Sequence, residues 1–102
     1  MTEWIKVVAM DDIPRQGARV VQHGERRIAV FRTAEDEVFA INDKCPHKGG
    51  HLSQGIVSGK LVTCPLHGMN IGLADGKAIA PDEGCAGVYP VKVDAGSVYL
   101  QL

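Results

Sequence analysis

Apolar residues along the chain fall in short runs of about four to seven residues that are rich in valine and isoleucine. Segments such as HGER, VSGK and DAGS separate these runs and supply the glycine and aspartate that tight hairpins need. Short apolar runs punctuated by turn residues predict an all-β protein. The expected strands cover residues 4–8, 18–22, 27–31, 38–41, 60–63, 88–93 and 97–100.

Seven short strands are typical of a sandwich or a small barrel of antiparallel sheets. Two segments between the strands, MDDIPRQG and HLSQG, each allow one short helical turn. The chain has 102 residues, which leaves no room for a second hydrophobic core. We therefore expect residues 1–102 to form a single domain.

Composition narrows the range of partners. Hydrophobic residues make up 45% and charged residues 23%, and the formal net charge is -1, so no basic surface for nucleic acid is expected. The sequence contains no export signal and no apolar segment long enough to span a membrane, so we expect a cytoplasmic protein without membrane contact. Three cysteines are too few for a disulfide scaffold, and in a reducing compartment they favour metal binding or redox chemistry.

Two short segments repeat one pattern of residue types. NDKCPHKGG follows the expected strand 38–41 and TCPLHG follows the expected strand 60–63, and each contains cysteine, proline, histidine and glycine. Proline biases the preceding cysteine toward extended backbone, where residues two apart face the same side, so Cys45 and His47 can point together. Cys64 and His67, three residues apart across a turn, can do the same. Two loops with metal-binding side chains are therefore expected to project from the sheets.

Two cysteines and two histidines suit more than one centre. Structural zinc takes this set, but its usual spacing pairs cysteine with cysteine and histidine with histidine, whereas here each loop mixes the two. Mixed loops suit a 2Fe-2S cluster in which two cysteines hold one iron and two histidines hold the other. A third possibility is that the cysteines are unliganded core residues and the histidines lie at the surface.

The spacing Cys45-x-His47, sixteen intervening residues, then Cys64-x-x-His67 closely resembles the signature of the Rieske family. This resemblance covers nearly the whole chain. It implies a fold of stacked antiparallel β-sheets with two cluster-binding loops at one tip. It also implies one 2Fe-2S cluster per chain, held by these four residues, and an electron carrier without a catalytic site of its own.

Within the family, the resemblance favours the ferredoxin-like branch of lower potential. The respiratory branch places two bracing cysteines where this chain has Gly50 and Leu66. It also supplies hydroxyl groups to the cluster where this chain has Met69 and Ile71. Fewer hydrogen bonds to the cluster sulfurs imply a lower reduction potential.

The segments CPHKGGHLSQGIV, APDEGC and VYPVKV are similar to the small subunit of assimilatory NAD(P)H nitrite reductase. That similarity implies a large partner subunit with flavin and sirohaem, which reduces nitrite to ammonia. The alternative is the Rieske ferredoxin of a ring-hydroxylating dioxygenase, partnered by the oxygenase and its reductase. A structural zinc-binding interaction module is the third hypothesis. In either redox role, the partner is expected to dock near Lys48, Gly49, Gly68 and Met69.

Three further residues carry metal-binding side chains but fall outside the paired motifs. His51 follows the first motif closely, and we expect it to be a solvated loop residue. His23 lies beside Gly24 in an expected hairpin turn and is predicted to be a surface residue. Cys85 has no cysteine left to pair with once Cys45 and Cys64 are ligands, so it is predicted to be a free thiol.

Overall fold

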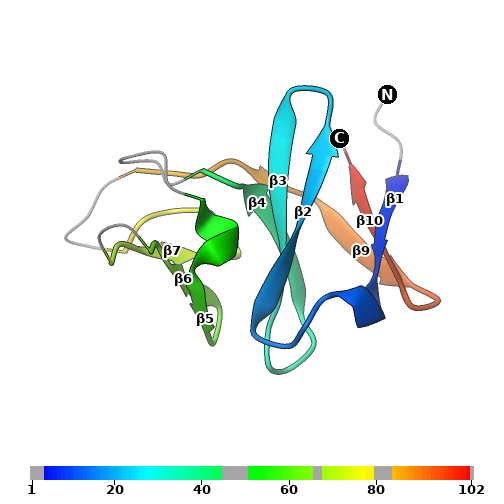
Figure 1. Ribbon diagram of the computed structural model, residues 1–102, viewed down its shortest axis with the longest axis horizontal. Coiled ribbons are helices and arrows are strands. Elements are labelled where there is room, and N and C mark those ends of the chain that lie inside the picture. Colours follow the sequence, from blue (N-terminus) through cyan, green and yellow to red (C-terminus); the bar gives the residue numbers. More distant parts are fainter. Residues whose placement is uncertain (1–3, 45–50, 66–67, 80–83, 102) are drawn as a thin grey trace.

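The described part of the chain forms ten strands in three antiparallel sheets in the computed structural model (Figure 1). The structure describes residues 4–44, 51–65, 68–79 and 84–101. The sheets have the strand orders β1-β10-β9, β2-β3-β4-β8 and β5-β6-β7. The elements are β1 (Trp4–Ala9), η1 (Met10–Asp12), β2 (Gly17–His23), β3 (Arg26–Arg32), β4 (Val38–Asn42), η2 (Leu52–Gln54), β5 (Ile56–Ser58), β6 (Leu61–Thr63), β7 (Asn70–Gly72), β8 (Val88–Tyr89), β9 (Val91–Asp94) and β10 (Ser97–Gln101). The predicted all-β fold of antiparallel sheets is confirmed, and the two expected helical turns are the 3-10 turns η1 and η2.

Strand β3 separates two hydrophobic cores. Its residues Ile28 and Val30 are fully buried in one apolar cluster, and Ala29 and Phe31 are fully buried in another. Successive side chains of a strand point to opposite faces of its sheet, so a strand buried along its whole middle must be covered on both faces. The β2-β3-β4-β8 sheet is therefore the central layer of the molecule.

The first core lies between the central sheet and the β1-β10-β9 sheet (Figure 1). Ile13, Val98 and Leu100 are fully buried there with Ile28 and Val30. Strand β10 pairs with both β1 and β9, so the two ends of the described chain lie side by side in one sheet. Leu52 and Cys64, at the flanks of the predicted ligand loops, lie on the opposite side of the central sheet.

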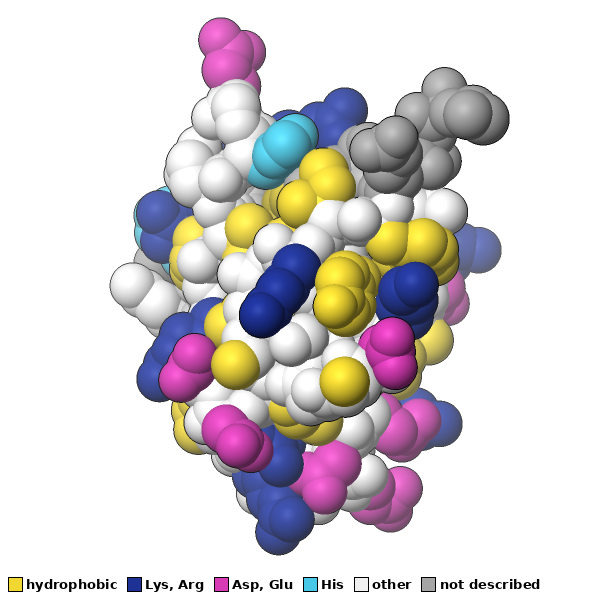
Figure 2. Space-filling view, turned by 90° about the vertical axis from the view of Figure 1, so that its right-hand side faces the viewer, with side chains coloured by type: hydrophobic (Ala, Val, Ile, Leu, Met, Phe, Trp, Pro, Cys, Tyr) yellow, Lys and Arg dark blue, Asp and Glu magenta, His cyan; other side chains and the backbone are white. Residues whose placement is uncertain are grey.

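The outer surface of the β1-β10-β9 sheet carries basic and acidic side chains with apolar patches between them (Figure 2). The Lys92 ammonium lies 5.1 Å from the ring centroid of Trp4 and 5.3 Å from that of Tyr99. Both distances are within the range of cation–π contacts.

No helix among the described residues is long and apolar enough to cross a membrane.

The second core lies between the central sheet and the small β5-β6-β7 sheet, next to the predicted ligand loops. Val57, Val62 and Ile71 contribute one buried side chain from each strand of that sheet. Leu52 and Cys64 are buried in the same cluster. The segments that flank the two loops are thus anchored on one apolar cluster.

The structure corrects the strand prediction in two places. Residues 88–93 were expected to form one strand, but β8 pairs with β4 in the central sheet while β9 pairs with β10. Pro90 has no N–H to donate, so it interrupts the strand where the chain crosses between sheets. Strands β5 and β7 were not predicted, because each has only three residues and includes serine, or asparagine and glycine, which are weak strand formers.

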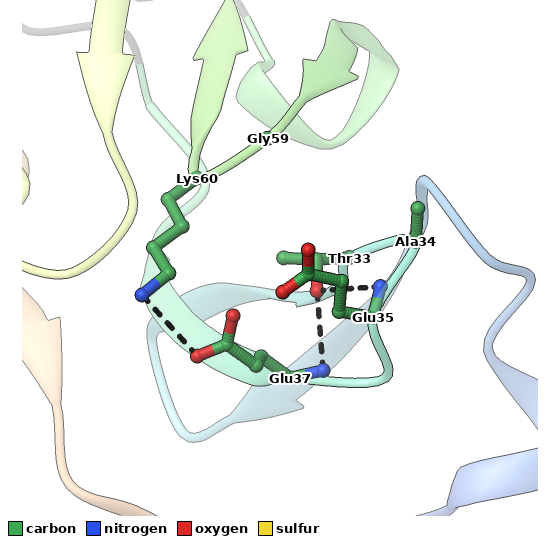
Figure 3. A pocket seen from close by; sticks show the side chains of 6 residues that line it. All are labelled: Thr33, Ala34, Glu35, Glu37, Gly59 and Lys60. Carbon is green, nitrogen blue, oxygen red and sulfur yellow. Dashed lines mark hydrogen bonds and ion pairs between the residues drawn. The ribbon is translucent and has the colours of Figure 1, made fainter.

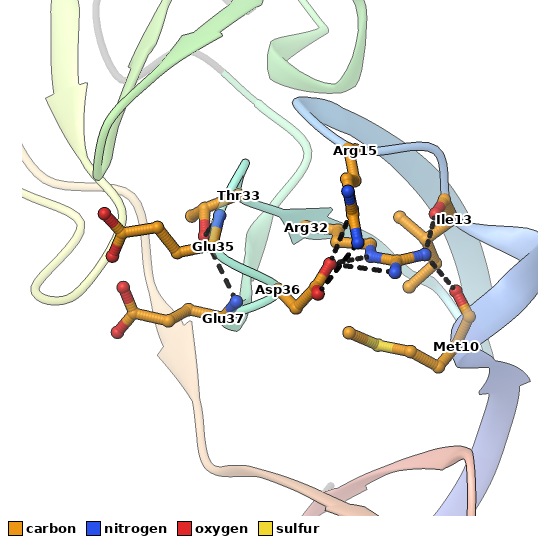
Figure 4. A network of polar contacts seen from close by, with 8 residues as sticks. All are labelled: Met10, Ile13, Arg15, Arg32, Thr33, Glu35, Asp36 and Glu37. Atoms are coloured by element: carbon orange, nitrogen blue, oxygen red, sulfur yellow. Dashed lines mark hydrogen bonds and ion pairs between the residues drawn. The ribbon is translucent and has the colours of Figure 1, made fainter.

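A polar network lies at the turn of the β3–β4 hairpin (Figure 4). The Asp36 carboxylate accepts hydrogen bonds from Arg32 Nε at 2.9 Å and Arg15 Nε at 3.0 Å. Arg32 Nη1 donates to the carbonyl oxygens of Met10 and Ile13 at 3.1 Å and 2.9 Å. This network joins the η1 turn to the central sheet, on a part of the chain distant from the predicted ligands.

A small cavity of about 200 Å³ lies where the β3–β4 hairpin meets the β5–β6 turn (Figure 3). Lys60 Nζ lies 3.4 Å from a carboxylate oxygen of Glu37 across it. The Thr33 hydroxyl accepts from the backbone N–H groups of Glu35 and Glu37 at 3.3 Å and 3.1 Å, which shapes the hairpin end. The ion pair links the central sheet to the small sheet.

Candidate metal centre

Cys64 is the predicted ligand that the structure describes. It directly follows β6 and its residue is 1% exposed, within the second core. Cys45, His47 and His67 lie outside the described residues. Among the residues that are described, no three histidine, cysteine, aspartate or glutamate side chains are grouped to hold a metal ion. The four-ligand assignment therefore stays a prediction.

Backbone hydrogen bonds close the turn that begins at Cys64. The Cys64 N–H donates to the Met69 carbonyl at 2.7 Å, and the Gly68 N–H donates to the Cys64 carbonyl at 3.0 Å. Thr63 pairs with Asn70 in the β6–β7 ladder, and the two side chains form a hydrogen bond of 2.6 Å. Cys64, Gly68 and Met69 thus lie at the closed end of the β6–β7 hairpin.

Gly68 is required by the conformation of this tip. Its φ is +72°, in the left-handed region that favours glycine. A Cβ atom at this position would meet nothing within 4 Å, so backbone strain alone would oppose a larger residue. The glycine in the second motif is therefore explained by the sharp turn that follows the predicted ligand segment.

A buried carboxylate anchors both ends of the other loop. Asp43, whose side chain is 0% exposed, accepts hydrogen bonds from Arg27 Nε at 2.7 Å, Ser53 N at 2.6 Å and Ser53 Oγ at 2.8 Å. The Asp43 N–H donates to the Arg27 carbonyl at 2.9 Å. Asp43 precedes the loop and Ser53 follows it, so these bonds set the span that residues 44–52 must bridge. A charged side chain in the core is stable only with such a set of partners.

Asp43 was not among the predicted site residues. The sequence places an aspartate two residues before Cys45, but it does not reveal that this carboxylate is buried against Arg27, sixteen residues earlier. His51 was expected to be a solvated loop residue. It is about half exposed, and its Nδ1 lies 3.6 Å from an Asp43 carboxylate oxygen, so it also belongs to the anchor.

The remaining sequence predictions near the site have mixed outcomes. Cys85 is an exposed free cysteine and His23 is exposed at the end of β2, as predicted. Docking of a partner near Met69 stays a prediction, although the Met69 side chain itself is buried. It is 3% exposed and packs in the second core with Cys64, where its apolar side chain is removed from water.

The described residues fit a cluster that needs shielded thiolate ligands. The Cys64 sulfur is held in an apolar cluster, and low exposure to solvent is one of the factors that tune the reduction potential of iron–sulfur centres. Leu52, which follows the first loop, and Cys64, which begins the second, share that cluster. The bases of both loops are therefore at the same end of the molecule. That the two cysteines and two histidines converge on one centre stays a prediction.

Comparisons with known proteins identify relatives along the whole chain. A family model described as a Rieske-like 2Fe-2S domain matches residues 3–101. The anthranilate 1,2-dioxygenase ferredoxin subunit of Burkholderia cepacia is 35% identical over 103 residues, which cover 100% of this chain and 94% of that protein.

Solved structures resemble the chain in fold. A complex of reduced oxygenase and oxidized ferredoxin in carbazole 1,9a-dioxygenase contains a chain that is 32% identical, with a TM-score of 0.85 over 96% of this chain and 92% of that one. The E. coli protein NirD, a nitrite reductase small subunit, is 28% identical, with a TM-score of 0.88 over 100% of this chain and 98% of that one. The stacked-sheet fold and the family resemblance are confirmed.

Proposed function

The chain belongs to the family of Rieske-like 2Fe-2S domains, and on that basis we propose that it carries single electrons as the ferredoxin component of a ring-hydroxylating dioxygenase system. Family membership and the ferredoxin relatives indicate a 2Fe-2S cluster. When bound, such a cluster accepts and releases one electron. The function is therefore electron delivery to a partner that performs the oxidation.

In this proposal Cys45 and Cys64 hold one iron as thiolates, and His47 and His67 hold the other through neutral imidazoles. Two observations support it. The Cys64 thiol is buried at a closed turn, and the Asp43 anchor ties together the two ends of the loop that contains Cys45 and His47. The flanks of both loops pack in one apolar cluster, which favours a shared centre. The whole chain acts as one domain in this assignment.

The dioxygenase role rests on the curated relatives. The dioxygenase ferredoxin of Burkholderia cepacia is more similar in sequence than NirD, at 35% against 28% identity, and both alignments cover the whole chain. The ferredoxin chain of the carbazole dioxygenase complex is also more similar, at 32%. Since all three share the fold, sequence similarity is the stronger guide to the partner.

A second candidate is the small subunit of an assimilatory nitrite reductase. The segments APDEGC and VYPVKV favour it, and the structural likeness to NirD supports it, with a TM-score of 0.88. In that role the chain would stay bound to a large subunit with flavin and sirohaem. A dioxygenase ferredoxin instead binds its partners transiently, through a small interface typical of redox encounters.

A deletion strain distinguishes the two roles. Loss of growth on an aromatic compound with normal growth on nitrite as the nitrogen source is expected for the dioxygenase ferredoxin. The reverse pattern would favour the nitrite reductase subunit and refute our proposal. Stable co-purification with a flavin- and sirohaem-containing protein would refute it independently.

Cysteine substitutions test the ligand assignment. The purified protein should be reddish-brown and contain about two irons and two sulfides per chain. Cys45→Ser and Cys64→Ser should abolish the colour and the iron, because each removes a thiolate ligand. The matched control is Cys85→Ser, which changes an exposed free cysteine and should leave both unchanged. Stoichiometric zinc in a colourless protein would contradict the assignment.

A further inference from the structure

A groove of about 480 Å³ lies beside the first predicted ligand loop. The β2–β3 turn, the end of β4 and β8 form its walls. Four of the residues that line it carry basic side chains: Arg26, Arg27, Lys44 and His51. Lys44 directly precedes residues 45–50 and His51 directly follows them, so the groove borders the base of the loop that contains Cys45 and His47.

The groove has more hydrogen-bond donors than acceptors. Asp43 contributes little to it, because its carboxylate is 0% exposed and already accepts from Arg27 and Ser53. Arg27 uses Nε for that bond, and its side chain is 43% exposed. Its two terminal nitrogens form no hydrogen bond to a carboxylate of the described residues. The remaining acidic residue of the lining is Glu25.

Arg26 and Lys44 are also without a carboxylate partner within the described ranges, although both are exposed. The Arg26 guanidinium lies 5.9 Å from the ring centroid of Tyr89, a contact that orients it over the groove and leaves its N–H groups available. The Tyr89 hydroxyl in turn donates to Asn42, which holds the ring in place.

Three cations away from the loops are arranged differently. Arg15 and Arg32 both pair with Asp36, and Lys60 pairs with Glu37. These three basic side chains thus share two carboxylates of their own chain. Lys6, on β1, also lacks a carboxylate partner among the described residues. The groove is therefore set apart by the grouping of Arg26, Arg27 and Lys44, which are available together for acceptors outside the chain.

We propose that this groove docks acidic side chains of the redox partner protein, with Arg26, Lys44 and the terminal nitrogens of Arg27 as donors to carboxylates. This inference rests on the proposed function as an electron carrier. A partner seated in the groove lies against the loop that contains two predicted ligands, which shortens the path of the electron. Complementary charge at such a surface raises the rate of encounter and sets the orientation of docking.

Two acceptor proteins of opposite charge test the proposal without any substitution. Plastocyanin serves as the acidic acceptor and cytochrome c as the basic one. In each reaction one reduced cluster loses one electron, and one copper or one haem iron gains it. With the wild-type protein, the rate for plastocyanin should fall steeply as salt is raised from about 10 mM to about 0.5 M, because screening removes the attraction. A rate for plastocyanin that is independent of salt, or that rises with salt, would overturn the proposal.

Charge-reversal variants then locate the effect. Arg26→Glu and Lys44→Glu should each lower the plastocyanin rate about tenfold at low salt, while the visible spectrum of the cluster stays unchanged. Lys6→Glu makes the same change of charge on β1, in the sheet on the other side of the central layer, and should change the rate less than twofold. Equal losses in Lys6→Glu and the two groove variants would show a general charge effect and refute the groove.

The same experiment separates the inference from the proposed function. A protein that binds no cluster and reduces neither acceptor would refute the electron-carrier function and, with it, the docking groove. A protein that reduces both acceptors, but whose Arg26→Glu and Lys44→Glu variants match Lys6→Glu, would refute the groove alone.

Discussion

At the scale of single residues, two carboxylates with arginine partners play different structural roles. Asp43 is buried and joins β3, the end of β4 and the η2 turn. Asp36 is exposed and joins the β3–β4 hairpin to Arg15, near η1. Removing a partner from a buried charge lowers the free energy of unfolding far more than removing one from an exposed charge. The reason is that water replaces the lost interaction only at the surface.

Asp43→Asn should loosen the first ligand loop. The amide has the same shape, but it cannot satisfy Arg27 and both Ser53 donors as a carboxylate does, so we expect a loss of about 2 kcal/mol of stability. Iron content per chain should fall, and the remaining cluster should be lost faster to a chelator. Asp36→Asn is the matched control and should retain iron as the wild type does. Normal iron retention in Asp43→Asn would contradict the anchoring role.

Asp36 should make folding stability depend on pH in the acid range. Hydrogen bonds from Arg32 and then from Arg15 lower the pKa of Asp36 below its usual value. A carboxylate whose pKa is lowered by folding stabilises the folded state. This contribution is fully present above the unfolded-state pKa of about 3.9, and it is lost as the pH falls through the folded-state pKa. Urea midpoints of wild type and Asp36→Asn should therefore differ at pH 7 and draw together as the pH falls below the unfolded-state value. A constant difference across this range would contradict the assignment.

At the scale of elements, the β6–β7 hairpin and the β2–β3 hairpin share one requirement. Each contains a glycine with positive φ and open space at the position of a Cβ atom: Gly68 at +72° and Gly24 at +61°. The first lies in the turn that closes after Cys64, and the second lies away from Cys64, in the turn next to His23. Substituting each of the two glycines therefore separates the effect of backbone strain on stability from the effect on the turn beside Cys64.

Gly68→Ala and Gly24→Ala should each cost about 1 kcal/mol of stability, because alanine is strained in the left-handed region. Only Gly68→Ala should also weaken cluster retention, since it distorts the turn between Cys64 and Met69. Thermal unfolding and iron content measured on both variants check this. Equal loss of iron in the two variants would show that general destabilisation, and not the shape of the turn, controls retention.

At the scale of the whole molecule, the central sheet divides the interior by function. The core toward β1-β10-β9 contains Ile28, and the core toward the small sheet contains Ile41 together with Cys64. Both isoleucines are fully buried and lie on neighbouring strands of the same sheet. Only the second core contacts the flanks of the ligand loops.

Ile28→Ala and Ile41→Ala should destabilise the fold by similar amounts, about 3 kcal/mol each, because both leave a cavity of the same size class. Ile41→Ala should in addition shift the visible spectrum or shorten the lifetime of the cluster, since it loosens the packing around Cys64. Ile28→Ala should keep the wild-type spectrum below its unfolding temperature. Identical spectral changes in both would argue against two separate cores.

Much of the fold was predictable from local patterns. Residues near the middle of each long strand were assigned correctly, because alternating apolar residues and glycine-rich turns act over a few neighbours. The short strands β5 and β7 were missed, and the break at Pro90 was not foreseen. Strands β5 and β7 pair with β6, their neighbour in the chain, but three residues are too few to show a pattern. The break at Pro90 depends instead on partners distant in sequence, such as Ile41 for Val88. The partner preference also changed, since the curated relatives favour the dioxygenase ferredoxin over the nitrite reductase subunit.

The sequence by itself determined the family and the kind of cofactor, because both depend on the types and spacing of a few residues in two short motifs. Only the tertiary structure decided how those motifs are supported. The burial of Asp43 against Arg27 and Ser53, and the packing of Leu52 beside Cys64, bring together residues from different elements. Such contacts form when three sheets stack and remove both partners from water, a condition that no local pattern in the chain contains.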